Sequence, residues 1–366
     1  MRVIISGGGT GGHVFPAIAI ADEIKRKDPQ AEILFVGAKG KLEMEKVPKA
    51  GYPIEGLEIA GFHRKLTIRN LLFPIKLVKS LIKARSIVRS FRPDVVVGVG
   101  GYASGPVLKM AQLHKVPTLI QEQNSYAGVT NKLLAKRADR ICVAYPSMDR
   151  FFPKDKILFT GNPVRTDIYD NDINTLGARK KLGLVQDKKT ILIFGGSLGA
   201  RSLNNAISAQ LENLCNGAYN IIWQVGKLYY NEFNIPSIVR KPNVTVLPFI
   251  EHMDQAYAAA DLIVCRAGAL TISEISLIKK AAILVPSPNV AENHQYENAM
   301  ALVKEDAAVL VEDKLANDSL VPTILELMQN DLRRSELAVN ISRFGKPDAA
   351  VKIGKEVMML AAKNNS

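Results

Sequence analysis

The stretch Val3-Ile4-Ile5-Ser6-Gly7-Gly8-Gly9-Thr10-Gly11-Gly12-His13 joins a short apolar run to a glycine-rich turn. Such a run is typical of a buried parallel strand, and the glycines let the backbone turn tightly into a helix. The pattern returns at Ile191-Leu192-Ile193-Phe194, followed by Gly195-Gly196-Ser197-Leu198-Gly199. Turns of this kind bring backbone N–H groups close to a phosphate. Two of them predict two nucleotide-fold halves that face a cleft.

The rest of the chain alternates in the same way. Apolar runs predict strands at residues 2–6, 31–36, 94–99, 117–121 and 139–143, and then at 189–194, 219–224, 243–247, 261–264, 282–285 and 307–310. Helical patterns between most of them predict an α/β fold with two parallel, doubly wound sheets. The break at Gly161-Asn162-Pro163 places a domain boundary near residue 163. A length of 366 residues suits two domains.

Composition narrows the class of protein. With 47% hydrophobic and 23% charged residues the chain is globular. No apolar run approaches the ~20 residues that span a bilayer, and the N-terminus lacks a secretory signal, so we expect a cytoplasmic protein. The three cysteines form neither a disulfide framework nor a metal motif. Asp170-Asn171-Asp172 has the spacing of some metal-binding sugar-nucleotide enzymes, but it follows no strand, and we interpret it as a turn.

The net charge of +13 is concentrated in one region. No acidic residue occurs between Glu58 and Asp94, where basic residues alternate with apolar ones. Because aromatic residues make up only 6% of the chain, anionic lipid headgroups are favoured over nucleic acid as the partner. The residues predicted to contact the membrane are Leu71, Leu72, Phe73, Ile75, Lys76, Lys79 and Lys83. The alternative is an ordinary amphipathic helix from Pro74 to Phe91 that buries Ile75, Val78, Ile82 and Val88 in its own domain.

The first glycine turn satisfies G-x-G-x-x-G, a weak signal shared with dinucleotide-binding oxidoreductases. The second predicted strand ends in Phe35-Val36-Gly37-Ala38-Lys39 without the carboxylate that would hold a ribose, which disfavours hydride transfer. No G-x-x-x-x-G-K-[ST] motif occurs, which disfavours a P-loop kinase or ATPase.

His13 ends the first glycine turn and begins a predicted helix. A helix N-terminus disfavours the imidazolium, so we hypothesise that His13 stays neutral and able to accept a proton. A histidine that only caps or packs is the general alternative, but at a glycine turn facing a cleft we favour a functional role.

A second group of polar residues lies in the segment from Cys265 to Glu274. This segment directly follows the apolar strand predicted at Asp261-Leu262-Ile263-Val264. A strand-to-helix turn here would lie at the ligand-binding edge of the sheet. Thr271 and Glu274 are also spaced as a capping box, so a ligand role and a structural role are both open. A further polar set, Asn293, His294, Gln295 and Asn298, supplies amide groups of the kind that bind sugar hydroxyls.

These motifs together resemble the MurG family, the UDP-N-acetylglucosamine transferases of peptidoglycan synthesis. The segments that carry the resemblance are 8–16, Gly100-Gly101-Tyr102-Ala103-Ser104-Gly105-Pro106, Glu122-Gln123-Asn124, Gly161-Asn162-Pro163-Val164-Arg165, Gly195-Gly196-Ser197 and 265–274. They run in family order past residue 298 and so cover nearly the whole chain.

The resemblance implies a GT-B fold, with an acceptor- and membrane-associated domain at 1–162, a donor domain at 163–345 and a last helix, about 346–366, packed back on the first domain. The implied reaction transfers N-acetylglucosamine (GlcNAc) from UDP-GlcNAc to the C4 hydroxyl of the muramoyl unit of lipid I. That acceptor is an undecaprenyl-pyrophosphoryl-MurNAc-pentapeptide at the cytoplasmic face of the cell membrane, where the protein would be peripheral. Inversion is implied, with no cofactor, no essential metal and no nucleic-acid partner.

The resemblance also assigns roles to residues. His13 would be the general base, and Gly9, Tyr102 and Ser104 would line the acceptor side. Asn124 and Gln295 would bind the GlcNAc hydroxyls, Ser197 the pyrophosphate, Glu274 the ribose, and Arg165 and the backbone at Ile250 the base end. The remaining donor contacts would be Thr10, Gly11, Gly12, Ala269, Leu270 and Thr271.

The sequence departs from the family where Leu198 and His294 replace common glutamines. Two rival functions stay open. One is a UDP-GlcNAc 2-epimerase, although the first glycine turn lacks the carboxylates that its proton chemistry needs. The other is a sugar-nucleotide-binding protein without catalytic activity.

Overall fold

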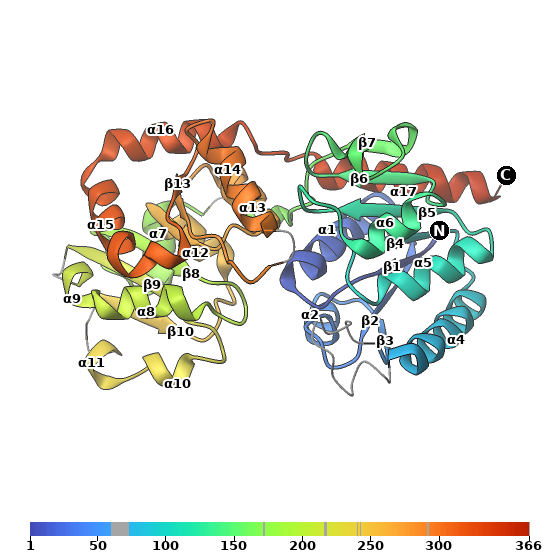
Figure 1. Ribbon diagram of the computed structural model, residues 1–366, viewed down its shortest axis with the longest axis horizontal. Coiled ribbons are helices and arrows are strands. Elements are labelled where there is room, and N and C mark those ends of the chain that lie inside the picture. Colours follow the sequence, from blue (N-terminus) through green and yellow to red (C-terminus); the bar gives the residue numbers. More distant parts are fainter. Residues whose placement is uncertain are drawn as a thin grey trace. The chain divides into compact units, whose positions relative to one another are not determined.

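The computed structural model describes residues 1–59, 73–170, 173–215, 218–239, 241, 243–290 and 293–365. The chain divides into two compact units, which are drawn in Figure 1. Unit 1 comprises Met1–Arg165 and Lys346–Ser366, and unit 2 comprises Thr166–Gly345. The division falls between Arg165 and Thr166, close to the turn at Gly161-Asn162-Pro163.

Unit 1 contains a parallel seven-stranded sheet in the order β3-β2-β1-β4-β5-β6-β7. Its strands are β1 (Arg2–Ser6), β2 (Glu32–Ala38), β3 (Ile54–Leu57), β4 (Val95–Gly98), β5 (Thr118–Glu122), β6 (Arg140–Val143) and β7 (Ile157–Phe159). The five strands predicted for this half are confirmed, whereas β3 and β7 were not predicted. Both are edge strands: β3 contains Glu55 and Gly56 and so lacks a continuous apolar run, and β7 is an apolar run of only three residues.

Helices cover both faces of this sheet. They are α1 (Gly11–Lys27), α2 (Glu43–Lys49), α4 (Phe73–Phe91), α5 (Ser104–Leu113), α6 (Val129–Ala135) and α17 (Ala349–Asn365). Successive β1 side chains separate the two cores: Val3 and Ile5 pack with α1 and α17, whereas Ile4 packs with α4, α5 and α6. The C-terminal helix α17 therefore completes the core of the N-terminal unit, where it lies against α1 (Figure 1).

Unit 2 contains a parallel six-stranded sheet in the order β10-β9-β8-β11-β12-β13. Its strands are β8 (Lys189–Phe194), β9 (Tyr219–Gln224), β10 (Val244–Leu247), β11 (Leu262–Cys265), β12 (Ala281–Leu284) and β13 (Val309–Leu310). All were predicted, with ends shifted by up to two residues. The helices are α7 (Thr175–Lys181), α8 (Arg201–Ala209), α9 (Leu211–Leu214), α10 (Tyr230–Phe233), α11 (Pro236–Val239), α12 (Met253–Ala259), α13 (Ala269–Ile278), α14 (His294–Val303), α15 (Ala316–Gln329) and α16 (Asp331–Ser342).

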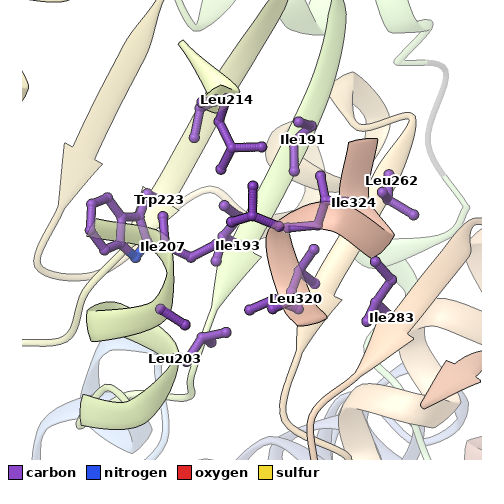
Figure 2. Packing of buried hydrophobic residues seen from close by; sticks show 14 of the residues in the cluster. Ile191, Ile193, Leu203, Ile207, Leu214, Trp223, Leu262, Ile283, Leu320 and Ile324 are labelled. Carbon is purple, nitrogen blue, oxygen red and sulfur yellow. The ribbon is translucent and has the colours of Figure 1, made fainter. Parts of the chain in front are cut away.

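One face of the unit 2 sheet carries a core of branched aliphatic side chains, with Trp223 at one side of it (Figure 2). Ile191 and Ile193 on β8 pack there with Leu320 and Ile324 from α15. Each fully buried side chain of this kind stabilises the fold by roughly 1.5–3 kcal/mol. The indole N–H of Trp223 donates to Asn204 Oδ1 at 3.2 Å, which satisfies the one polar group of that side chain.

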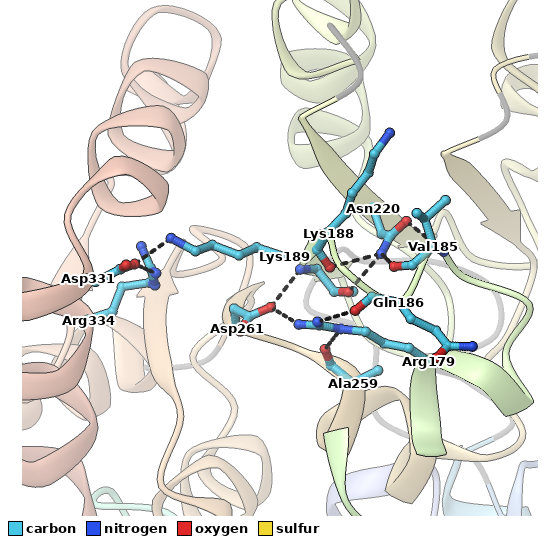
Figure 3. A network of polar contacts seen from close by, with 11 residues as sticks. Arg179, Val185, Gln186, Lys188, Lys189, Asn220, Ala259, Asp261, Asp331 and Arg334 are labelled. Carbon is cyan, nitrogen blue, oxygen red and sulfur yellow. Dashed lines mark hydrogen bonds and ion pairs between the residues drawn. The ribbon is translucent and has the colours of Figure 1, made fainter. Parts of the chain in front are cut away.

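A polar network ties α7 to the amino-terminal ends of β8 and β11 (Figure 3). The guanidinium of Arg179 donates to Asp261 Oδ2 at 2.5 Å and to the carbonyl oxygen of Gln186 at 2.9 Å. The N–H of Thr190 donates to the same Asp261 oxygen at 2.7 Å. The buried Arg179 is thus paired and hydrogen-bonded, as a buried charge requires. This network lies at the sheet edge opposite to the glycine turn.

Two sequence motifs fall partly outside the described residues. Leu71 and Leu72 of the predicted membrane contact lie there, and so do Asn171 and Asp172 of the acidic triplet. Within the described ranges, no helix has both the length and the apolar character needed to cross a bilayer.

Candidate active site

In each sheet the strand order reverses next to the strand that carries a glycine turn. The reversal lies between β1 and β4 in unit 1, and between β8 and β11 in unit 2. Ligands of open α/β sheets bind outside the carboxyl ends of the strands at such points. Both glycine turns therefore occupy the position that the topology favours for a ligand.

The first glycine turn rests on a buried carboxylate that sequence reasoning missed. Glu43, the first residue of α2, is 1% exposed and accepts hydrogen bonds from the N–H groups of Gly9 at 2.8 Å and Ala38 at 2.9 Å. A Cβ on Gly8 would lie 2.2 Å from the Glu43 carboxyl carbon, and one on Gly37 would lie 2.4 Å from its Cγ. Both glycines are needed because the Glu43 side chain fills the space beside them.

This carboxylate corrects two expectations. The end of β2 does meet a carboxylate, although Glu43 binds backbone N–H groups rather than a ribose. The Gly9 N–H is also occupied, so it is not one of the amides that could approach a phosphate. Gly11 and Gly12 begin α1, and their N–H groups have no acceptor within the helix.

His13 lies in the first turn of α1 and is partly exposed. Its Nδ1 is 3.3 Å from the Thr10 hydroxyl. A Cβ on Gly100, which has a φ of +88°, would lie 3.0 Å from both Nε2 and Cδ2 of His13. The imidazole is therefore held between its own turn and the backbone that follows β4.

The two acceptor-side residues on that second turn differ in their surroundings. Tyr102 is 54% exposed. Ser104 is fully buried, and its hydroxyl donates to the carbonyl of Gly101 at 3.0 Å. The Ser104 hydroxyl therefore closes the turn, and the placement of Ser104 on the acceptor side stays a prediction. Gly101 in turn packs on the first glycine turn, since a Cβ there would lie 2.4 Å from the Gly8 carbonyl oxygen.

At the carboxyl end of β5, the buried Glu122 organises the segment that carries Asn124. Glu122 Oε1 accepts from the N–H and the side-chain amide of Asn124, at 3.1 and 3.3 Å. Glu122 Oε2 accepts from the N–H of Gly128 at 3.0 Å and from Asn131 Nδ2 at 2.8 Å. Asn124 is partly exposed and held in place, as a ligand contact requires.

Arg165 belongs to unit 1 and lies over an aromatic ring. Its guanidinium carbon is 5.0 Å from the centroid of the Phe15 ring on α1. Arg165, a predicted donor contact, therefore lies in the same unit as His13 and against the same helix, α1. The predicted donor contacts Ser197, Ile250 and Glu274 belong to unit 2.

The second glycine turn leads into α8 in unit 2. Gly196 and Gly199 have φ values of +92° and +82°, which favour glycine, and Ser197 between them is partly exposed. A Cβ on Gly199 would lie 2.0 Å from the carbonyl oxygen of Val225, so this turn packs directly on the end of β9. The Gly199 N–H donates to the Gly196 carbonyl at 3.0 Å, whereas the first N–H groups of α8 have no acceptor within the helix and so suit an anion.

Gln224 links this turn to the loop that carries Ile250, and sequence reasoning missed it. The buried amide donates to the Gly196 carbonyl at 2.9 Å and accepts from the Ile250 N–H at 2.8 Å. The Ile250 N–H therefore already has a partner within the protein. The predicted backbone contact to the base of a nucleotide would have to use other backbone atoms of this loop. A glutamine at the carboxyl end of a predicted strand is the signal that could have identified it.

The turn after β11 is anchored by Arg266. Its guanidinium donates to Asp313 Oδ1 at 2.5 Å, to the Ser202 hydroxyl at 2.8 Å and to the carbonyl of Val285 at 2.9 Å. The preceding Cys265 is fully buried, and burial raises the pKa of its thiol, with a smaller contribution from the Glu274 charge. Cys265 is therefore an inert core thiol and not a nucleophile.

Helix α13 follows this turn and carries Glu274. Its N-cap is Gly268, without a side-chain cap hydrogen bond, so the capping-box alternative for Thr271 and Glu274 is wrong. Glu274 lies in the second turn and accepts a hydrogen bond from the Tyr257 hydroxyl at 2.8 Å. Thr271 is partly exposed, whereas the side chains of Ala269 and Leu270 are buried, which leaves their backbone as the group able to contact a sugar.

The two amide side chains on α14, Gln295 and Asn298, have different surroundings. Gln295 is partly exposed, and its Oε1 accepts from the Ser287 N–H at 2.9 Å. Asn298 is fully buried and donates to the carbonyl of Ala267 at 3.4 Å, so it supports the β11 turn. Among the described residues, no cluster of three or more His, Cys, Asp or Glu side chains is arranged to hold a metal.

Helix α4 exposes the apolar residues that an ordinary amphipathic helix would bury. Ile75, Val78 and Ile82 are 55%, 55% and 65% exposed. Of the residues that this alternative named, Val88 is buried, and it lies on the domain-facing side with Ser80, Ala84 and Ile87. Lys76 and Lys79 are exposed beside the apolar stripe, whereas Lys83 is 3.3 Å from Glu55 and donates to the Gly56 carbonyl.

Comparisons with known proteins agree with this geometry. Residues 3–143 match the glycosyltransferase family 28 N-terminal domain, and residues 190–353 match the glycosyltransferase family 28 C-terminal domain. A Bacteroides fragilis protein is 55% identical over 364 residues, covering 99% of this chain and 96% of that protein. It is named UDP-N-acetylglucosamine–N-acetylmuramyl-(pentapeptide) pyrophosphoryl-undecaprenol N-acetylglucosamine transferase.

Solved structures show the same architecture. A crystal structure of Acinetobacter baumannii MurG has a TM-score of 0.73 and 30% identity, covering 98% of this chain and 99% of that one. A UDP-GlcNAc 2-epimerase from Neisseria meningitidis has a TM-score of 0.68 at 16% identity, covering 98% and 100% of the two chains, a likeness of fold alone. The chain belongs to the MurG family of UDP-N-acetylglucosamine transferases within glycosyltransferase family 28.

Proposed function

We propose that this protein transfers GlcNAc from UDP-GlcNAc to the C4 hydroxyl of the MurNAc unit of lipid I, with inversion at the anomeric carbon. The product is lipid II, a precursor of peptidoglycan. The observation that carries the proposal is the 55% identity, over 99% of the chain, to a transferase of that name.

The chemistry suits the groups at the two glycine turns. The acceptor oxygen attacks the anomeric carbon of GlcNAc, the bond from that carbon to the UDP oxygen breaks, and the hydroxyl proton goes to a base. His13, held by Thr10 and Gly100, is the proposed base. The amides at Ser197 and the α8 N-terminus are proposed to stabilise the charge on the departing UDP.

The donor and acceptor contacts are proposed residue by residue. Glu274 is proposed to bind the ribose, and Gln295 and Asn124 the GlcNAc hydroxyls. Gln295 supports this because its Oε1 accepts a hydrogen bond from the Ser287 N–H, so its amide nitrogen is the group left to donate to a sugar hydroxyl. Tyr102 is proposed to contact the acceptor because its side chain is exposed beside the first glycine turn.

A direct test is mass spectrometry of a reaction that contains the protein, UDP-GlcNAc, a short-chain lipid I analogue and a metal chelator. We expect a product heavier by one N-acetylhexosamine, with release of UDP. Formation of UDP-ManNAc without transfer would instead indicate an epimerase, and neither product would indicate a binding protein. Transfer that stops on chelation and returns with added metal would contradict metal independence.

We further propose that the protein is peripheral at the cytoplasmic face of the membrane and binds it through α4. The exposed stripe of Ile75, Val78 and Ile82 beside Lys76 and Lys79 supports this, because apolar side chains next to cations suit an anionic bilayer surface.

Replacing both Lys76 and Lys79 by alanine is expected to weaken sedimentation with phosphatidylglycerol vesicles by roughly 30-fold, at about 1 kcal/mol for each lysine. Alanine at Lys180 and Lys181, two exposed lysines on α7, is the matched control for charge. Alanine at Lys83 is expected to have a smaller effect than either Lys76 or Lys79, since Lys83 is already paired with Glu55. Equal binding by the Lys76/Lys79 variant and its control would refute the proposal.

A further inference from the structure

Tyr257 is a core tyrosine whose hydroxyl reaches a residue of the candidate donor site. The side chain on α12 is 1% exposed, and its hydroxyl donates to Glu274 Oε2 at 2.8 Å. Its ring packs edge-on against Phe194, with centroids 6.1 Å apart and an interplanar angle of 66°. Phe194 is the last residue of β8, directly before the second glycine turn. Core packing therefore determines where this hydroxyl lies.

Glu274 contrasts with Tyr257, because it is partly exposed on α13. A carboxylate on a flexible side chain can rotate about its terminal bonds, and a hydrogen bond from a rigid donor restricts that rotation. Tyr257 lies on α12, which precedes β11 in the chain, and Glu274 lies on α13, which follows β11. Their hydrogen bond therefore joins the two helices that flank this strand in sequence. The ring is thus a rigid support for a carboxylate at the ligand-binding edge of the sheet.

We propose that Tyr257 is a positioning residue that sets the orientation of Glu274 and thereby the recognition of the ribose of a uridine nucleotide. The inference rests on the proposed role of Glu274 in the donor site. A carboxylate that is already held in one orientation can accept hydrogen bonds from the ribose hydroxyls without being ordered first. A freely rotating carboxylate must be ordered when the nucleotide binds, and this entropy cost reduces the free energy of binding. Tyr257 would then contribute to the preference for a nucleotide with ribose hydroxyls without touching the nucleotide itself.

The Tyr257→Phe substitution tests this because it removes only the hydroxyl and keeps the ring against Phe194. Binding of UDP and of 2′,3′-dideoxy-UDP is measured by calorimetry for the wild type, Tyr257→Phe, Glu274→Gln and the double variant. We expect Tyr257→Phe to weaken UDP about tenfold and the dideoxy analogue less than twofold. The double variant is expected to match Glu274→Gln, since the tyrosine acts through the carboxylate. In turnover, the KM for UDP-GlcNAc should rise with kcat nearly unchanged.

The control is Tyr219→Phe, a change of the same chemistry at the first residue of β9, on the amino-terminal edge of the sheet. Its ratio of UDP to dideoxy-UDP affinity should equal that of the wild type. An unchanged ratio in Tyr257→Phe, or an equal loss of affinity for both nucleotides, would overturn the inference. If Tyr257→Phe fails this test but Glu274→Gln lowers the ratio of UDP to dideoxy-UDP affinity, only the positioning role of Tyr257 is refuted. If Glu274→Gln does not lower that ratio either, the ribose role of Glu274 is refuted as well, whether or not the enzyme transfers GlcNAc.

Discussion

The His13→Ala variant is expected to transfer GlcNAc about 10²–10⁴-fold more slowly than the wild type, the usual contribution of a general base. The reason is the position of the imidazole, in the first turn of α1 and against the backbone of Gly100. UDP binding should be nearly unchanged, because Ser197 and Glu274 belong to the other unit. Steady-state kinetics and calorimetry with UDP separate the two effects.

His114, which follows α5, supplies the matched control. His114→Ala should retain wild-type transfer, because this histidine lies at the opposite end of α5 from the Gly100 turn. A second check is the Thr10→Val variant, which removes the hydroxyl 3.3 Å from His13 Nδ1 and should slow transfer less than His13→Ala does. Full activity in His13→Ala would show that another group or a water takes the proton.

The Glu43→Gln variant is expected to lose about 2–4 kcal/mol of stability, because the buried carboxylate accepts two backbone N–H groups. An amide has only one oxygen to accept with, and its NH₂ would face the second N–H. We expect the midpoint of thermal unfolding to fall by roughly 5–15 °C. Transfer should also fall at temperatures where the variant is folded, since Glu43 holds the turn that leads to His13.

Glu45, two residues later on α2, is the control for this change. Its carboxylate is 44% exposed and pairs with Lys49 at 3.1 Å, so Glu45→Gln should change stability by no more than about 0.5 kcal/mol. Differential scanning calorimetry of both variants makes the comparison. Equal midpoints for Glu43→Gln and Glu45→Gln would contradict the supporting role of Glu43.

Local sequence patterns predicted most of the fold. Every strand buried between two neighbours appears in the sequence as an apolar run, and the glycine turns mark the ends of β1 and β8. The strands that escaped prediction, β3 and β7, lie at sheet edges. A single neighbour demands less apolar surface, so Ile54-Glu55-Gly56-Leu57 has no distinctive pattern.

The candidate site was predictable only in part. His13, Asn124, Ser197, Glu274 and Gln295 all lie at the carboxyl ends of strands or on the helices that follow, where motif reasoning expected them. The sequence could not show that the Ser104 hydroxyl closes its turn, because a serine after a glycine turn has the same local pattern whether its side chain faces a ligand or the backbone. The capping-box spacing of Thr271 and Glu274 left two roles open for a similar reason, since spacing alone cannot show which residue begins the helix.

The sequence by itself determined two parallel α/β units, the location of both glycine turns and the family, because strand apolarity, turn chemistry and motif order are all short-range properties. Only the tertiary structure decided which side chains support those turns. Glu43, Gln224 and Tyr257 each act on residues brought close by the order of the strands or the packing of helices. The exposed face of α4 was decided in the same way, since the sheet buries Ala84, Ile87 and Val88 and so turns Ile75 and Ile82 outward.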